Sequence, residues 1–192
     1  MKYTFEKLQK HTEMIRADSL PLISKNEEAW GNAVGLFSEY YKKLEKLPKT
    51  TDRNVKMILA TRFMNHLYSS FLLVVSGMSS DSVTCERSAV EVLAAYKLLC
   101  VKPELAEKYN NGKFLKPYEV RNELEKQGYP EEKERIKGIY RSASGITHVN
   151  RDHERFSMEW ERESAGLLYV GGRFKETDVS HMLEFLPVLI HE

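Results

Sequence analysis

The sequence has very few cysteines, and this limits the chemistry that its thiols can support. Cys85 and Cys100 are the only two among 192 residues. If both lie on one helix, the 15 positions between them place them roughly 22 Å apart, far beyond the reach of a disulfide. Two isolated thiols also match no zinc-binding pattern. We therefore expect both to be ordinary core residues of a protein from a reducing compartment.

The sequence also lacks an apolar run long enough to cross a membrane. Its most apolar stretch, residues 67–78, is shorter than the roughly 20 residues that a spanning helix needs. The start of the chain, MKYTFEKLQKHTEMIR, is polar throughout and does not resemble a secretion signal. These features indicate a cytoplasmic protein with no membrane partner.

An excess of charge of one sign is absent as well. Lysine and arginine together number 29, and aspartate and glutamate number 28. Whole-protein charge therefore gives no reason to expect a nucleic-acid partner, although a local basic cluster remains compatible with it. The composition, 42% hydrophobic and 30% charged, is that of an ordinary globular protein. The length and the lack of internal repeats indicate a single domain over residues 1–192.

What the sequence does contain is a helical pattern. Apolar residues recur at intervals of three and four along most of the chain. Pro21 is predicted to separate the first two helices by a turn, and Gly77 and Gly128 are predicted to end later ones. Residues 167–170 are predicted to form a short extended piece or hairpin arm. The predicted helices cover residues 4–17, 26–47, 52 to about 76, about 79–101, 103–109, 117–127, 130–149, and a last helix after residue 177. N-caps are predicted in the Thr50–Asp52 run, in the Ser79–Asp81 run and at Thr177 and Asp178.

Four of these predicted helices have at least four turns, and their connections are short. This combination is typical of an up-and-down bundle. We therefore predict an all-α fold, in which four main helices form the bundle and additional short helices pack around it.

Two segments carry more polarity than a core-facing helix needs. In the first, Arg87 and Glu91 stand four positions apart and so share one helix face. Their neighbours look buried, which would place the pair at the edge of the bundle interior. The simplest interpretation is a structural ion pair that fixes helix register; the alternative is that the pair orients a site.

The second segment runs from Tyr140 to His148. Arg141 and His148 are seven positions apart, about 700° of helical rotation, so they project from nearly the same side, with Ser144 between them. A histidine moves protons near neutral pH, and an arginine offers a fork of donors to a phosphorane, so the two together suit phosphodiester cleavage. Alternatively, basic residues late in a helix simply complement its dipole.

The spacing of Arg141 and His148 on a late helix resembles the motif of the HEPN superfamily, in which four to six residues separate an arginine from a histidine. The order of parts is similar too: Gly77-Met78, the Arg87–Glu91 helix, Pro103 and Tyr109, then residues 140–148. The sequence thus resembles a poorly characterised prokaryotic branch of HEPN-like helical proteins, most strongly over residues 52–150.

The resemblance implies a helical bundle that commonly forms a homodimer, with the Arg–His stripes of two subunits around one cleft. In active members this cleft cuts RNA without a metal or other cofactor, and the ribose 2′-hydroxyl is the nucleophile. Such members often serve as toxins, with an antitoxin or regulatory partner, or in anti-phage defence. Carried over to this sequence, His148 is the general acid and base and Arg141 stabilises the phosphate. Arg87, Glu91 and Ser144 would support the site.

One position departs from the pattern. Active members often carry Asn, Asp or His directly after the arginine, whereas this sequence has Ser142. Because the superfamily includes members that only bind RNA, nucleotides or proteins, a non-catalytic HEPN-like RNA- or protein-binding module is the alternative. A small-molecule enzyme with a pocket around Arg87 and Glu91 is a third. A metal site built on His148 and His153 is not expected, since five positions do not place two side chains on one helix face.

Overall fold

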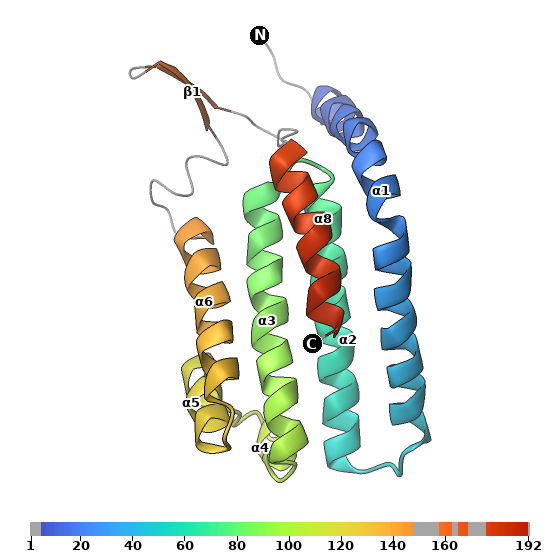
Figure 1. Ribbon diagram of the computed structural model, residues 1–192, viewed down its shortest axis with the longest axis vertical. Helices are drawn as coiled ribbons and strands as arrows, with labels where there is room; N and C mark the ends of the chain where they lie inside the picture. The colour runs from blue at the N-terminus through green and yellow to red at the C-terminus, as the bar shows by residue number, and fades with distance from the viewer. Residues whose placement is uncertain (1–4, 148–157, 163–164, 169–175, 192) are drawn as a thin grey trace.

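The computed structural model is a bundle of long helices with shorter helices at one end and a hairpin near the other (Figure 1). It describes residues 5–147, 158–162, 165–168 and 176–191; within residues 142–147 it describes the backbone alone. The all-α prediction is confirmed. The elements are α1 (Phe5–Lys46), α2 (Thr51–Val74), α3 (Ser79–Val101), α4 (Leu105–Asn110), α5 (Pro117–Lys126), α6 (Pro130–Thr147), β1 (Met158–Arg162), β2 (Ala165–Leu168) and α8 (Glu176–His191).

Helices α2 and α3 form an antiparallel pair at the centre of the bundle (Figure 1). Ser70 and Ser82 are fully buried where the two helices cross, and each hydroxyl bonds to the opposite helix. The Ser82 hydroxyl donates to the Ser70 carbonyl at 2.9 Å, and the two hydroxyl oxygens are 2.8 Å apart. Small side chains allow the backbones to approach, and the paired hydroxyls leave no unsatisfied polar group there. The core spreads from this pair, chiefly through Val55, Leu59, Leu67, Val74, Ala89, Val90, Leu98 and Leu99.

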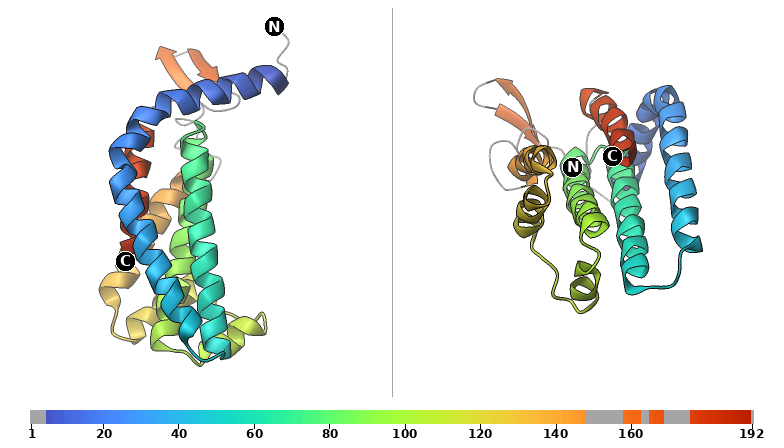
Figure 2. Two further views of the ribbon diagram at one scale, coloured as in Figure 1. Left: turned by 90° about the vertical axis from the view of Figure 1, so that its right-hand side faces the viewer. Right: turned by 60° about the horizontal axis from the view of Figure 1, so that its bottom comes forward.

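The predicted turn at Pro21 is wrong, because α1 continues through the proline as one helix. Proline removes a single backbone hydrogen bond and bends a helix without always ending it. Here packing overrides that cost: Ile15 and Ser19 are buried before the proline, and Leu22 packs against the core after it. Figure 2 shows α1 bending over the top of the bundle in its N-terminal part.

The N-terminal part of α1 is held against the end of α2. The Arg16 guanidinium donates to the Ser76 hydroxyl at 3.0 Å, and the Ser19 hydroxyl contacts the Val75 carbonyl at 3.4 Å. At the other end of α2, the predicted threonine cap is confirmed, since the Thr50 hydroxyl accepts from the Arg53 amide at 3.2 Å. The cap predicted for the next helix is wrong: α3 begins after Met78, which makes no side-chain capping bond.

The glycines predicted to end helices do so. Gly77 has a φ of +79° and Gly128 a φ of +89°. After each one, the chain folds back so that the next amide bonds to a carbonyl of the last turn: Met78 to Leu73 at 2.9 Å and Tyr129 to Leu124 at 3.0 Å. A side chain is strained in this left-handed conformation, which explains why glycine occupies both positions.

The last helix closes the bundle. The side chains of Val179, Met182, Leu183 and Leu189 on α8 are buried, and α8 lies mainly against α1. The Trp30 indole of α1 donates to the Leu183 carbonyl at 3.2 Å, which joins the two ends of the chain. Before α8, β1 and β2 form an antiparallel hairpin with Met158 opposite Leu168, so the predicted extended segment is confirmed for residues 167–168.

The glycine conformations predict that alanine changes the free energy of unfolding in opposite directions at Gly128 and at Gly31. Gly128→Ala places a side chain at positive φ and is expected to lower the free energy of unfolding by about 1–2 kcal/mol. Gly31→Ala lies within α1, where a Cβ meets no atom within 4 Å, and is expected to raise it by roughly 0.5–1 kcal/mol. Urea unfolding of both variants measures the difference. Equal shifts of one sign would contradict the assigned helix end.

Candidate functional site

The predicted catalytic arginine lies on the outer side of α6. Arg141 is exposed, whereas Ile136 of the same helix is 2% exposed. Five positions separate them, about 140° of net rotation, so Arg141 points away from the core. The same outer side carries Lys137, which pairs with Glu134 at 2.8 Å. The pKa of the Glu134 carboxyl is lowered chiefly by its hydrogen bond to Lys137, and Arg141 adds to this effect.

The predicted partners of Arg141 cannot be placed beside it. His148 lies outside the described residues. Ser144 is part of α6, but its side chain is not described. A Cβ added to Gly138, the residue after Lys137, meets no atom within 4 Å. Gly138 is itself exposed.

The predicted ion pair between Arg87 and Glu91 forms, with 3.3 Å between Arg87 Nε and Glu91 Oε1. The structure adds two partners from other helices. Arg87 also donates to the Tyr140 hydroxyl of α6, and its Cζ lies 4.1 Å from the centre of the Tyr140 ring. Arg121 of α5 lies over the same ring at 4.9 Å. We call these three residues the Arg87–Tyr140–Arg121 cluster.

The cluster joins α3, α5 and α6 through cation–π contacts, which are worth about 0.5–2 kcal/mol each depending on exposure. It also brings Arg87 and Arg121 to the residue directly before Arg141. Sequence reasoning included Tyr140 in the candidate segment but gave it no role, and it did not identify Arg121. No local pattern links positions 87, 121 and 140, because their contact arises only when three helices pack together.

Two further titratable groups lie near the Arg87–Glu91 pair. His66 of α2 is half-buried; burial lowers the pKa of its imidazole, Arg62 lowers it further, and Glu91 opposes both. Glu86, directly before Arg87, is 8% exposed, and burial raises the pKa of its carboxyl to about 7. Sequence reasoning missed Glu86 because a glutamate in a helix is ordinarily a solvent-exposed charge.

The comparisons with known proteins place most of this region in one family. Residues 53–164, which are 112 of the 192 residues, match the model of DUF5677, a family of unknown function. The chain belongs to this family. The DUF5677 match contains all the predicted site residues, from Arg87 to His148, and the cluster of α3, α5 and α6. No curated protein and no solved structure matches the chain.

Two general properties of the DUF5677 chain follow from the described residues. None of the helices they form is long and apolar enough to cross a membrane. Within the same residues, no three His, Cys, Asp or Glu side chains are grouped so that they would hold a metal ion.

The structure has a cavity elsewhere than around Arg87 and Glu91, because neither residue is among those that line it.

Burial of Glu86 gives a prediction about stability and pH. Its pKa rises from 4.5 to about 7 on folding, so the folded protein binds more protons between these values. The stability contribution is therefore fully present below pH 4.5 and is lost as the pH rises through about 7, by up to about 3 kcal/mol. Glu86→Gln is expected to remove this loss, so that its stability relative to the wild type increases from pH 5 to pH 8.

Urea unfolding at both pH values measures the effect. Asp81→Asn, an exposed acidic position on the same helix, is the matched control and is expected to keep the wild-type pH dependence. If Glu86→Gln follows the wild type as closely as Asp81→Asn does, Glu86 titrates like an exposed carboxyl and the assigned burial is incorrect.

Proposed function

We propose that this chain is a metal-independent endoribonuclease of the HEPN type, active as a homodimer in toxin or anti-phage defence. The observation that carries the proposal is the exposure of Arg141 on the outer side of α6. A guanidinium on an open helix surface can reach an RNA phosphate or a second subunit, whereas one buried against α3 could not. The resemblance of the Arg141–His148 spacing supplies the class of reaction.

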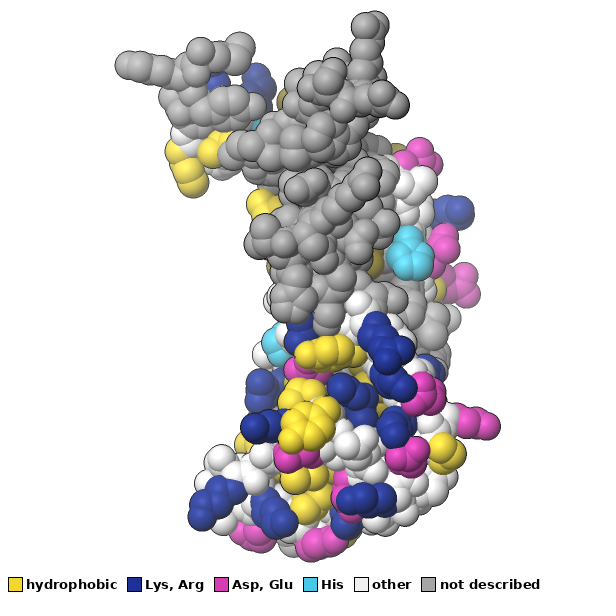
Figure 3. Space-filling view, turned by 90° about the vertical axis from the view of Figure 1, so that its left-hand side faces the viewer, with side chains coloured by type: hydrophobic (Ala, Val, Ile, Leu, Met, Phe, Trp, Pro, Cys, Tyr) yellow, Lys and Arg dark blue, Asp and Glu magenta, His cyan; other side chains and the backbone are white. Residues whose placement is uncertain are grey.

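The neighbourhood of Arg141 supports recognition of an anionic chain. Arg87 and Arg121 both contact the ring of Tyr140, the residue directly before Arg141 in α6. Figure 3, seen from the side of α5 and α6, shows many Lys and Arg side chains on the described part of this face, with acidic groups between them. A local basic surface of this kind is compatible with a net charge of +1.

In the proposed reaction His148 removes the proton from a ribose 2′-hydroxyl, whose oxygen attacks the adjacent phosphorus. Arg141 donates hydrogen bonds to the phosphorane oxygens as negative charge accumulates there. The 5′-oxygen of the next nucleotide leaves and takes up a proton from a histidine acting as an acid. The products are a 2′,3′-cyclic phosphate and a 5′-hydroxyl. Two subunits with their stripes side by side would supply two histidines and two arginines to one cleft.

The proposal is tested by incubating the purified protein with mixed cellular RNA in the presence of EDTA. We expect cleavage that leaves 2′,3′-cyclic phosphate ends. His148→Ala is expected to lower the rate about 10²–10⁴-fold, because it removes the proton-transfer group. Arg141→Ala is expected to lower it about 10²–10³-fold, because it removes a donor to the transition state.

Lys137→Ala is the matched control, since it removes a positive charge from the same side of α6. It is expected to change the rate only several-fold. Full activity of folded His148→Ala would rule out the proposed mechanism, and equal losses in Lys137→Ala and Arg141→Ala would reduce the role of Arg141 to general charge.

The alternative is a non-catalytic RNA- or protein-binding module, favoured by Ser142 at the position that follows the arginine. Serine neither titrates near neutral pH nor offers an amide. Under this alternative, the wild type retains RNA or a regulatory protein without cleaving anything, and Arg141→Ala weakens retention. Mobility shift with the same RNA, run beside the cleavage assay, distinguishes the two functions.

A further inference from the structure

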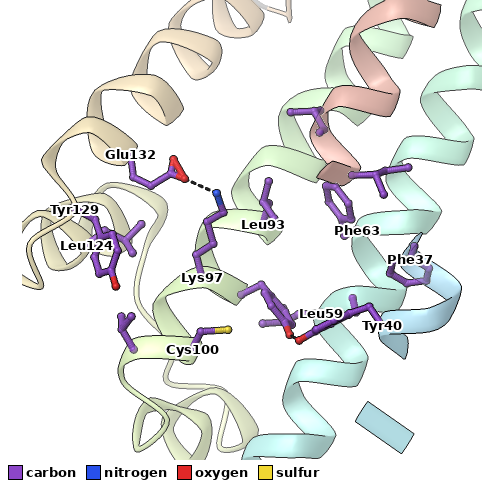
Figure 4. Close-up of a pocket in the computed structure, with 15 residues that line it drawn as sticks. Phe37, Tyr40, Leu59, Phe63, Leu93, Lys97, Cys100, Leu124, Tyr129 and Glu132 are labelled. Carbon is purple, nitrogen blue, oxygen red and sulfur yellow. Dashed lines mark hydrogen bonds and ion pairs between the residues drawn. The ribbon is translucent and has the colours of Figure 1, made fainter. Parts of the chain in front are cut away.

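A cavity of about 520 Å³ lies where α1, α2, α3, the end of α5, the start of α6 and the end of α8 meet (Figure 4). Several of its lining residues are buried: Leu59 and Leu124 are each 1% exposed and Phe63 is 6% exposed. Tyr40 and Tyr129 also line it and are 41% and 45% exposed, so the cavity reaches solvent. Pockets that hold small molecules have volumes of about 300–1,000 Å³.

Five aromatic rings line the cavity, among aliphatic side chains. Phe37 and Tyr40 come from α1, Phe63 from α2 and Tyr96 from α3, and Tyr129 precedes α6. The Tyr40 and Tyr96 rings meet edge to face, with 6.1 Å between their centres, and their hydroxyls are in contact. Rings arranged on several sides favour an aromatic guest, since aromatic pairs gain about 0.5–1.5 kcal/mol beyond simple burial.

The charged groups on the described cavity wall neutralise each other. Lys97 of α3 forms an ion pair with Glu132 of α6 across one side of the cavity (Figure 4). Glu132 is also held from outside the cavity by Arg135, at 2.8 Å. A charged guest would lose its hydration among apolar side chains and would have to break this pair to find a counter-charge. The lining therefore favours a neutral guest.

We propose that this cavity is a binding site for an uncharged, aromatic small molecule. The guest fills the space between the Tyr40–Tyr96 pair and Phe63, which Leu189 and Ile190 of α8 also line. Arg87, Glu91 and Arg141 are not among the described residues that line the cavity. The inference is thus independent of the proposed ribonuclease.

A matched pair of fluorescent dyes tests the proposal. N-phenylnaphthylamine is neutral and aromatic, and anilinonaphthalene sulfonate adds one negative charge to the same ring system. We expect saturable one-to-one binding of the neutral dye, at least about tenfold tighter than binding of the sulfonate, because burial of a charge without a free counter-charge is unfavourable. Absence of saturable binding, or equal or tighter binding of the sulfonate, would overturn the proposal.

Two variants of α3 locate the bound dye. Cys100 is an exposed residue of the cavity lining, so Cys100→Phe adds a ring to that lining and is expected to weaken binding of the neutral dye about tenfold or more, since it takes space from the guest. Thr84→Phe adds the same ring at an exposed position of the same helix and is expected to leave binding unchanged. Equal binding by both variants would overturn the assignment of the dye to this cavity.

The wild-type thiols provide a test that needs no substitution. The expectation that both cysteines are core residues is wrong, because Cys100 is exposed and Cys85 is half-buried. Cys100 lines the cavity, and Cys85 is not among its lining residues. Burial raises the pKa of both thiols, so labelling with N-ethylmaleimide is followed at pH 8 by peptide mass spectrometry. Saturating neutral dye is expected to slow labelling of Cys100 severalfold and to leave Cys85 unaffected. Unchanged labelling of Cys100 in the presence of bound dye would contradict the proposed site.

Discussion

The close contact between α2 and α3 is the constraint on which the other helices depend. Ser70 and Ser82 are fully buried where the two helices meet, and their reciprocal hydrogen bonds fix one register between them. A shift of either helix by one residue would bury two hydroxyls without partners, which costs about 1–3 kcal/mol for each group. With this register fixed, α3 presents Arg87 and Lys97 toward α6, and α2 and α3 present part of the apolar surface that α8 covers together with α1.

Helix α6 is joined to α3 at two levels by different chemistry. Near the start of α6, Glu132 pairs with Lys97, and about two turns later the Tyr140 hydroxyl accepts a hydrogen bond from Arg87. Ile136, between these positions, is 2% exposed and supplies the apolar contact. One polar contact on each side of an apolar contact fixes both the rotation of α6 about its axis and its position along that axis. This arrangement turns Arg141 outward, because Arg141 lies about 140° from Ile136 on the helix.

Much of the fold could be predicted from the sequence, because helix ends are determined locally. A threonine that caps α2 and glycines that end α2 and α5 act through bonds within a few residues. Pro21 could not be judged in the same way, since the burial of Ile15 and Ser19 against distant residues decides whether the helix continues. For the candidate site, the Arg87–Glu91 pair was predictable from a four-residue spacing, whereas Tyr140, Arg121 and the cavity depend on contacts between helices. Glu86 differs again: its sequence context gives no sign that α3 carries a carboxyl into the interior.

The exposed Arg141 and the cavity lie on opposite sides of α6. Glu132 lines the cavity and Arg141 is exposed; the nine positions between them correspond to about 900° of rotation, which leaves them half a turn apart. A molecule in the cavity would therefore not touch RNA at Arg141. It could affect the outer side only by moving α6 relative to α3, and such movement would have to disturb the Lys97–Glu132 pair or the contact of Arg87 with Tyr140. Coupling between the two regions thus requires a second stable position of α6, and neither proposal depends on its existence.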